Sequence, residues 1–207
     1  MSCTIRLLVF LLIISGGYSY SYAQEKVLLL SGKEIEGEKV EKDSVDVRIT
    51  RTKKKKKKFT FYDQSRVFSI TKADGTTEIL YFQDTTDENA LSIREMQYYI
   101  VGEQDAMKSY KAPLALIGGF VITAVATYQW GPYIGLIPVI PITLGMAMIS
   151  PKIKRKAVSN PDLLREDTYI MGHRRKAKNI KVQRVITGAI GGFVVGILTA
   201  TIVTNIN

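Results

Sequence analysis

The sequence predicts an α+β membrane protein, in which a small antiparallel β domain precedes amphipathic helices and about three short transmembrane helices. Two stretches without charged residues, 112–150 and 185–207, are long enough to enter a bilayer. The segment 151–184 between them holds eleven of the 29 Lys and Arg residues but only three acidic residues. Residues 24–84, in contrast, show the two-residue alternation of half-buried strands. The net charge of +10 is thus concentrated in one segment flanked by apolar stretches, which indicates an integral membrane protein.

Residues 1–23 have the three zones of a secretory signal peptide. Arg6 precedes the apolar run Leu7–Ile14, and the small-residue end Ser21–Ala23 predicts cleavage after that segment. An uncleaved anchor is the alternative, although the apolar run is short for a span of about 30 Å. Because the only cysteine is Cys3, the expected mature chain has neither a disulfide nor a thiol nucleophile.

Residues 24–84 are expected to form the small β domain. Val47 and Ile49 alternate with polar residues, as in a strand with one buried face. The dipeptide Asp74-Gly75 lies between two β-prone runs and predicts a tight hairpin. About five or six short strands in this length favour a barrel-like arrangement of the SH3 or Sm type.

A run of six lysines falls inside this β pattern. These cations could contact an anionic surface, such as phospholipid or lipopolysaccharide headgroups. We favour a solvated hairpin tip or an edge strand that its charges protect from aggregation, because 16 acidic residues balance 17 basic ones over positions 24–111. Nucleic acid is not an expected partner, since no aromatic residues are interleaved with the lysines. The run comprises Lys53, Lys54, Lys55, Lys56, Lys57 and Lys58.

Helical periodicity begins near residue 85 and predicts a juxtamembrane helix over residues 85–111. Thr85 and Glu88 have the spacing of a capping box, in which each residue satisfies a backbone amide of the other. The amphipathic pattern ends at Lys111, immediately before the first long uncharged stretch. This helix is therefore expected to lead the chain to the membrane surface.

Residues 112–150 are about twice as long as one membrane span requires. We therefore predict a transmembrane hairpin of two short helices, 113–129 and 133–150, with a break at Gly131-Pro132. A single span followed by a re-entrant segment is the alternative, which is tolerated only where protein covers the re-entrant backbone.

Residues 151–184 are predicted to form a basic amphipathic helical segment, and residues 185–204 a C-terminal transmembrane helix. The cations are candidate contacts for an anionic membrane surface, whereas glycines in the apolar helices allow close approach of helix backbones. The candidate contacts in the basic segment are Lys152, Lys154, Arg155, Lys156, Arg174, Arg175, Lys176, Lys178, Lys181 and Arg184. The glycines expected at helix packing contacts are Gly118, Gly119, Gly188, Gly192 and Gly196.

A weak internal repeat connects the two halves of the helical region. The motif Tyr99-Ile100-x-Gly102 reappears as Tyr169-Ile170-x-Gly172, and each copy precedes a Gly-Gly-Phe-Val sequence. Two units of the same orientation would place the basic segment on the same side of the membrane as the β domain. The preference of Lys and Arg in short loops for the cytoplasmic side argues the opposite. We favour the hairpin, because each of its halves has nearly spanning length.

Several segments of this sequence resemble those of a largely uncharacterised group of Bacteroidetes envelope proteins. They are the signal peptide ending Ser21–Gln24, the strand phrase Phe61–Ile70, the phrase Gly135–Pro138, and Tyr169-x-x-Gly172 followed by spaced lysines. The resemblance implies a Gram-negative cell envelope. In such an envelope we expect the inner membrane as anchor and the β domain in the periplasm. The resemblance implies no established activity. The six-lysine run and His173 depart from the pattern of the group.

No constellation of catalytic, cofactor-binding or metal-binding residues stands out. His173 is the only histidine, and its place beside two arginines predicts a solvated helix residue. Glu103 and Asp105, two residues apart on a helix, are expected to point to different faces as surface charge. The predicted spans contain no ionisable side chain, which disfavours an ion or proton path.

These observations favour a non-enzymatic scaffold or anchoring subunit without a cofactor. Its expected partners are membrane lipids and either another protein or a second copy of the chain. A small channel or membrane-perturbing protein is the alternative, suggested by Gly- and Pro-rich apolar segments beside cations. An enzyme that acts on lipid or peptidoglycan is the third hypothesis, and it would need carboxylates outside the spans for acid-base chemistry.

Overall fold

The computed structural model describes residues 24–53, 56–155 and 158–206, which divide into two compact units. Unit 1 contains the described residues up to Leu28 together with Glu34–Leu80, and unit 2 contains Leu29–Lys33 and Tyr81–Asn207. The fold is α+β, with small antiparallel sheets in unit 1 and long helices in unit 2. The predicted signal peptide lies outside the described residues.

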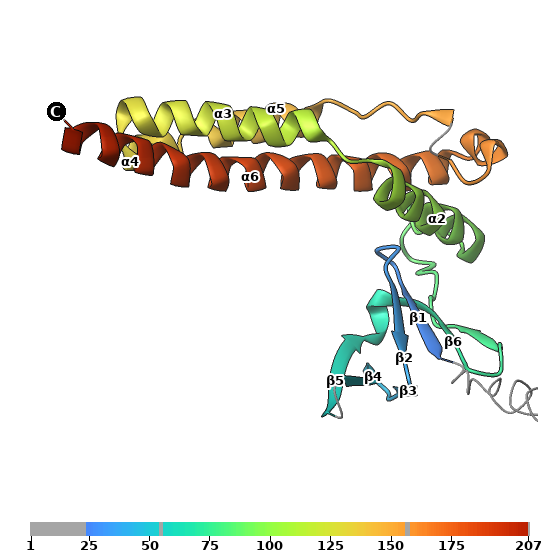
Figure 1. Cartoon of the computed structure of the whole chain (residues 1–207). Coiled ribbons are helices and arrows are strands. Elements are labelled where there is room, and N and C mark those ends of the chain that lie inside the picture. The colour runs from blue at the N-terminus through green and yellow to red at the C-terminus, as the bar shows by residue number, and fades with distance from the viewer. Residues whose placement is uncertain (1–23, 54–55, 156–157, 207) are drawn as a thin grey trace, which may run out of the picture. The chain divides into compact units, whose positions relative to one another are not determined.

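One sheet of unit 1 has the strand order β2-β1-β6-β7 (Figure 1). Its strands are β1 (Glu25–Leu29), β2 (Glu34–Gly37), β6 (Val67–Thr71) and β7 (Thr77–Ile79). The turn between β6 and β7 confirms the predicted hairpin: Gly75 has φ 85°, and the Thr76 amide donates to Asp74 Oδ1 at 2.8 Å. Glycine is favoured there because a side chain resists positive φ.

The second sheet has the order β3-β4-β5, with β3 at Lys39–Lys42, β4 at Asp46–Lys53 and β5 at Lys56–Asp63. The alternation in β4 holds, because Val47 and Ile49 are fully buried. Lys53 ends β4, and Lys56, Lys57 and Lys58 begin the edge strand β5, whereas Lys54 and Lys55 lie outside the described residues. A short 3-10 helix, Gln64–Arg66, connects this sheet to β6. Closure of the strands into an SH3- or Sm-like barrel stays a prediction.

The first helix of unit 2 begins later than the sequence pattern predicted, at Ile93 and not near residue 85, whereas the next long helix begins at Pro113 as predicted. The helices of this unit are α2 (Ile93–Ser109), α3 (Pro113–Trp130), α4 (Pro132–Gly135), α5 (Val139–Met148) and α6 (Asp167–Ile206), with a 3-10 helix at Pro161–Arg165. The capping box of α2 pairs Ser92 with Glu95, not Thr85 with Glu88. The reason is local: Asp84 accepts a hydrogen bond from the Thr86 amide at 2.9 Å, which favours a turn over a helix.

The 40-residue helix α6 joins two segments that the sequence separated. It contains the second part of the basic segment and the apolar residues 185–204 without interruption. No Gly or Pro lies at the junction of Arg184 and Val185, so nothing in the local sequence ends the helix there. Within the described residues, α3 and α6 are long and apolar enough to cross a membrane, and Pro132–Met148 is a shorter apolar stretch.

Helices α3 and α6 run in the same direction and lie in backbone contact (Figure 1). An added Cβ at Gly192 would overlap the carbonyl oxygen of Phe120, and one at Gly196 would approach the Ala124 oxygen to 2.8 Å. Because the partners follow the same order in both helices, the pair is parallel. Small residues spaced one turn apart permit this close approach.

The other glycines predicted at helix contacts differ in their surroundings. Gly188 approaches the backbone of Leu116, and Gly119 approaches that of Val185, so both lie in the α3–α6 contact. Gly118 does not: a Cβ added there would meet nothing within 4 Å. It lies one residue away from the contacting face, since adjacent helix residues point about 100° apart.

The segment between α3 and α6 returns along the bundle. Gly135 in α4 contacts Thr127 near the end of α3, whereas Lys181 Nζ donates to the Ile149 carbonyl at 2.9 Å near the start of the apolar part of α6. The chain therefore traverses the helical bundle along α3, back along α5, and again along α6. The break at Gly131-Pro132 agrees with the prediction, but the predicted second helix, 133–150, is divided into the short helices α4 and α5, and the number of membrane crossings stays a prediction.

Candidate functional site

The two copies of the repeat motif pack against each other where α2 crosses α6. A Cβ at Gly102 would overlap the Tyr169 carbonyl oxygen, and one at Gly172 would overlap that of Tyr99. Each tyrosine backbone thus occupies the space that the glycine of the other copy leaves free. The sequence predicted the repeat, but the reciprocal contact is visible only in the structure.

Asp105 is the centre of a buried hydrogen-bond network at this crossing. Its Oδ2 atom accepts from the Tyr169 hydroxyl at 2.8 Å, the Ser159 hydroxyl at 2.8 Å and the Ser159 amide at 2.9 Å. Asp105 and Glu103 are each 5 % exposed, so their interpretation as surface charge was wrong. The segment around Ser159 folds over α2 and covers Asp105, which no helical spacing rule would reveal.

Glu103 belongs to a second polar cluster on the same crossing. It accepts a weak hydrogen bond from the Tyr99 hydroxyl at 3.4 Å, and Lys176 Nζ lies 3.7 Å from its other carboxylate oxygen. Arg175 donates to the Tyr99 hydroxyl at 2.9 Å. Burial raises the pKa of Glu103, and the positive charge of Lys176 opposes that shift. Arg175 and Lys176, predicted as membrane contacts, therefore hold the α2–α6 crossing together.

A cavity of about 320 Å³ lies beside this crossing, where α2 ends and α3 begins. His173 is 2 % exposed, so the prediction of a solvated histidine was wrong. Both ring nitrogens lack a hydrogen-bond partner within the described part of the chain. The lining residues are Ser109, Tyr110, Lys111, Ala112, Pro113, Lys152, Lys154 and His173. α6 approaches α2 closely at His173, since a Cβ added at Gly102 would come within 2.9 Å of the His173 amide nitrogen.

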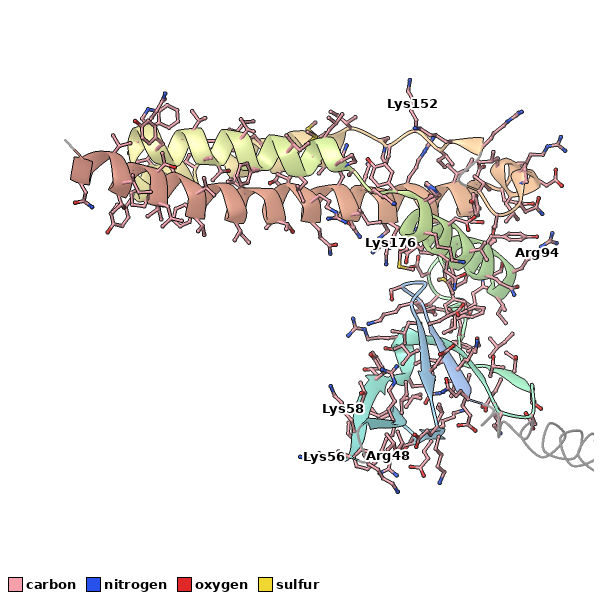
Figure 2. The ribbon with its side chains drawn as sticks, viewed as in Figure 1. Arg48, Lys56, Lys58, Arg94, Lys152 and Lys176 are labelled. Atoms are coloured by element: carbon pink, nitrogen blue, oxygen red, sulfur yellow. The ribbon has the colours of Figure 1, made fainter. Side chains whose placement is uncertain are left out.

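The remaining predicted surface cations divide by exposure. Lys181 is buried and tied to the Ile149 carbonyl, whereas Lys178 is half-buried. Figure 2 shows Lys56 and Lys58 projecting from β5, and Lys152 projecting from the segment before α6. The described exposed cations of the prediction are Lys56, Lys57, Lys58, Lys152, Lys154, Arg155, Arg174, Arg175 and Arg184. The side chain of Lys53 and residues Lys54, Lys55 and Lys156 lie outside the described part.

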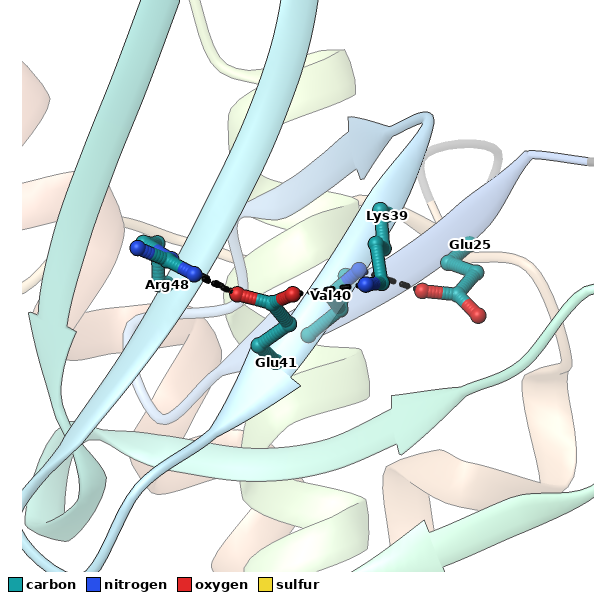
Figure 3. A network of polar contacts seen from close by, with 5 residues as sticks. All are labelled: Glu25, Lys39, Val40, Glu41 and Arg48. Carbon is teal, nitrogen blue, oxygen red and sulfur yellow. Dashed lines mark hydrogen bonds and ion pairs between the residues drawn. The ribbon is translucent and has the colours of Figure 1, made fainter.

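The three-stranded sheet carries an exposed polar network that includes Lys39, Glu41 and Arg48 (Figure 3). Lys39 Nζ lies 2.7 Å from Glu41 Oε1, and Arg48 Nε donates to Glu41 Oε2 at 2.8 Å. Hydrogen bonds from Lys39 and then Arg48 lower the pKa of Glu41 to about 2. The Arg48 guanidinium lies 5.7 Å from the centroid of the Phe59 ring, although Phe59 and Phe61 remain 50 % and 60 % exposed.

Replacing Asp105 with leucine should leave the Tyr169 hydroxyl and both Ser159 donors without their buried acceptor. Hydrogen bonds to a charged group contribute about 1.5–3 kcal/mol each, so we expect the free energy of unfolding to fall by about 3 kcal/mol. SDS titration of the protein in detergent micelles measures this loss, and trypsin should cleave faster after Lys152 and Lys154. Asp105→Asn keeps an acceptor oxygen and should lose less. Unchanged stability of the leucine variant would contradict the assigned network.

The chain matches no protein-family model, no curated protein and no solved structure. Among residues 24–53, 56–155 and 158–206, no three His, Cys, Asp or Glu side chains gather in a way that could hold a metal ion. The geometry of the two units is therefore the basis for a functional proposal.

Proposed function

We propose that the protein is a non-enzymatic scaffold of a bacterial envelope membrane, with three apolar segments in the bilayer and a β unit that recruits a partner. Support for the membrane part comes from exposed apolar surface. In the most apolar 18-residue stretch of both α3 and α6, only 28 % of the residues are buried. Leu114 and Ile140 are among the exposed aliphatic side chains of the bundle. Contiguous apolar surface of this kind is typical of a membrane or protein interface.

The packing of the helices disfavours the two alternative functions. A channel between α3 and α6 would require space that their backbone contacts occupy. An enzyme using Glu103 and Asp105 would need these carboxylates at a substrate, but Asp105 already accepts three hydrogen bonds and Glu103 is paired with Lys176. A scaffold needs neither an open path nor a free acid-base pair.

Strand β5 is the part of the β unit that we assign to the partner, and its edge position carries the proposal. Among the described strands, β5 pairs only with β4, so its other edge can accept an added strand. Phe59 and Phe61 lie on one face of β5, because alternate residues of a strand point to the same side. Their exposed rings would provide apolar contact beside the backbone hydrogen bonds.

The charge of β5 determines which occupant fits. Lys56, Lys57 and Lys58 begin the strand and make no ion pair with the described acidic residues. Like charges oppose pairing of two copies of this edge, whereas they favour a segment that carries Asp or Glu. The proposed partner therefore contributes an extended acidic segment in the periplasm.

A photo-crosslinking amino acid at Tyr62 in the full chain, expressed in native membranes, tests this assignment. We expect one discrete adduct whose crosslinked peptide, identified by mass spectrometry, is acidic and extended. Phe59→Ser combined with Phe61→Ser should reduce the adduct at least tenfold. Val45→Ser, which changes another exposed apolar residue of unit 1, serves as the matched control and should leave the adduct intact.

Three outcomes would overturn the proposed partner contact. They are the absence of a discrete adduct, an adduct that survives the double serine variant, and an adduct of twice the mass of the chain. The last outcome would assign β5 to self-association. Membrane insertion is measured separately, by resistance to extraction with alkaline carbonate, so the two parts of the proposal can fail independently.

A further inference from the structure

The cavity between α2, α3 and the segment after α5 has the composition of an anion site. Lys111 lies in the short link between α2 and α3, and Lys152 and Lys154 lie on the segment between α5 and α6. None of the eight described lining residues is acidic, so these three lysines are not neutralised within the lining. The nearby carboxylate of Asp105 is engaged by Ser159 and Tyr169.

His173 provides the second, independent indication of a ligand. Its side chain is almost fully buried and lines the cavity, but neither Nδ1 nor Nε2 has a partner in the described part of the chain. A buried polar group without a hydrogen bond costs about 1–3 kcal/mol. An acceptor in the cavity would satisfy the ring N–H and remove this cost.

The start of α3 adds a third contribution. Ala112, its N-cap, has φ 44° and no side chain that could accept from the first helical amides. Pro113 has no N–H and the Ala115 amide donates to the Ala112 carbonyl at 3.2 Å, which leaves the Leu114 amide of this turn for a ligand. The N-terminus of a helix carries a partial positive charge and favours anions. The 18-residue helix α3 therefore directs its positive end toward the cavity that Ala112 and Pro113 line.

We propose that this cavity binds a phosphate group, supplied by the headgroup of an anionic phospholipid. The three lysines would neutralise the phosphate oxygens, His173 would donate a hydrogen bond, and the N-terminus of α3 would cap the anion. The lipid source rests on the proposed membrane insertion, because α3 is one of the two membrane-length helices and the cavity lies at its first residue. Basic pockets beside membrane helices recognise lipid headgroups in this way.

The single histidine of the chain makes this proposal directly measurable. The full chain, purified without a histidine tag and labelled with 15N-histidine, gives one imidazole signal set. We expect its resonances to shift when phosphatidylcholine nanodiscs are replaced by nanodiscs that also contain phosphatidylglycerol. Inorganic phosphate added to the phosphatidylcholine discs provides the second arm. A shift in the lipid arm alone identifies a headgroup site, whereas a shift with inorganic phosphate alone would replace the lipid by a soluble phosphate ligand.

Matched charge variants separate the cavity from general surface attraction. Lys111→Gln, Lys152→Gln and Lys154→Gln together should weaken the response at least tenfold, whereas the corresponding arginine triple variant should retain it. A control triple variant changes three exposed lysines of β5 and should respond as the wild type does. These control substitutions are Lys56→Gln, Lys57→Gln and Lys58→Gln.

The outcomes that overturn the proposal are a response in neither arm and a response that persists in the cavity glutamine variant. Loss of the response in the arginine variant would also overturn it. The imidazole spectrum in phosphatidylcholine discs without added inorganic phosphate or anionic lipid shows whether the variants keep the wild-type fold. Failure of the protein to enter nanodiscs would contradict the proposed membrane insertion. Anion binding by the cavity can still be measured in that case, by adding inorganic phosphate to the protein in detergent micelles.

Discussion

Replacing Gly192 with leucine is expected to separate α3 from α6 and to cause the largest loss of stability among single substitutions in the bundle. The first atom of the new side chain would overlap the Phe120 carbonyl and come within 3.0 Å of the Ala124 amide. Neither backbone group can move without shifting a helix. Added side-chain volume in a packed interior typically costs about 1–3 kcal/mol, and more where backbone must move. We expect a loss of about 3 kcal/mol.

The matched control is Gly118→Leu, because a Cβ at Gly118 meets nothing within 4 Å. It makes the same chemical change in the partner helix and should alter the free energy of unfolding by less than about 0.5 kcal/mol. Trp130, the only tryptophan, lies at the end of α3 and reports the transition by its fluorescence during SDS titration. Equal loss in both variants would show that leucine acts through something other than the α3–α6 contact.

Local patterns predicted the parts of this fold that depend on neighbouring residues. The Asp74-Gly75 turn required a residue that tolerates positive φ, and the alternation around Val47 and Ile49 reported a buried face. The spaced glycines of α6 indicated close helix packing, because only small residues allow it. The turn and the alternation have their structural cause within the same hairpin or strand, whereas the glycines of α6 indicate a close contact without identifying its partner in α3.

The candidate sites depend on contacts between distant residues, which no local pattern contains. Asp105 is buried because Ser159, 54 residues away, hydrogen-bonds to it. His173 is followed by two arginines, which suggested exposure to solvent, but it is buried where α6 closely approaches Gly102 of α2. The reciprocal contact of the repeat could have been proposed from Gly102 and Gly172, since each glycine offers space for backbone. That step requires knowing that the two motifs meet.

The α2–α6 crossing and the parallel pair of α3 and α6 both arise from the internal repeat. In each half of the helical region, a helical Tyr-x-x-Gly motif precedes a Gly-Gly-Phe-Val apolar segment. The first motifs meet at the α2–α6 crossing, and the apolar segments then lie side by side in α3 and α6. Because α3 and α6 are parallel, the two copies of the repeat have the same direction. The geometry thus supports the orientation that the repeat suggested and that the distribution of positive charge opposed.

Cysteine labelling should place both ends of the bundle on opposite sides of the membrane. In a Cys3→Ser background, cysteines at Ser159 and Asn179 should react with a membrane-impermeant thiol reagent in intact spheroplasts. The near end of the bundle contains both positions, because Lys181 contacts Ile149 there. Cysteines at Tyr133 and Asn205, at the far end, should react only after the membrane is permeabilised. All four positions are exposed, so burial does not limit the reaction.

A cysteine at Ser44 completes the measurement, because no apolar segment separates the β unit from the start of α3. It should label together with Ser159, which places the basic segment at the outer leaflet with the β unit. Labelling at Ser44 but protection at Ser159 would show an odd number of crossings between them and would contradict the parallel arrangement of α3 and α6. Protection of both, with labelling at Tyr133, would preserve that arrangement but move the β unit and its cations to the cytoplasm. The labelling pattern therefore tests the packing of the helices separately from their orientation in the membrane. The orientation matters because Lys and Arg residues in short loops favour the cytoplasmic side, which is opposite to the side expected here for the basic segment.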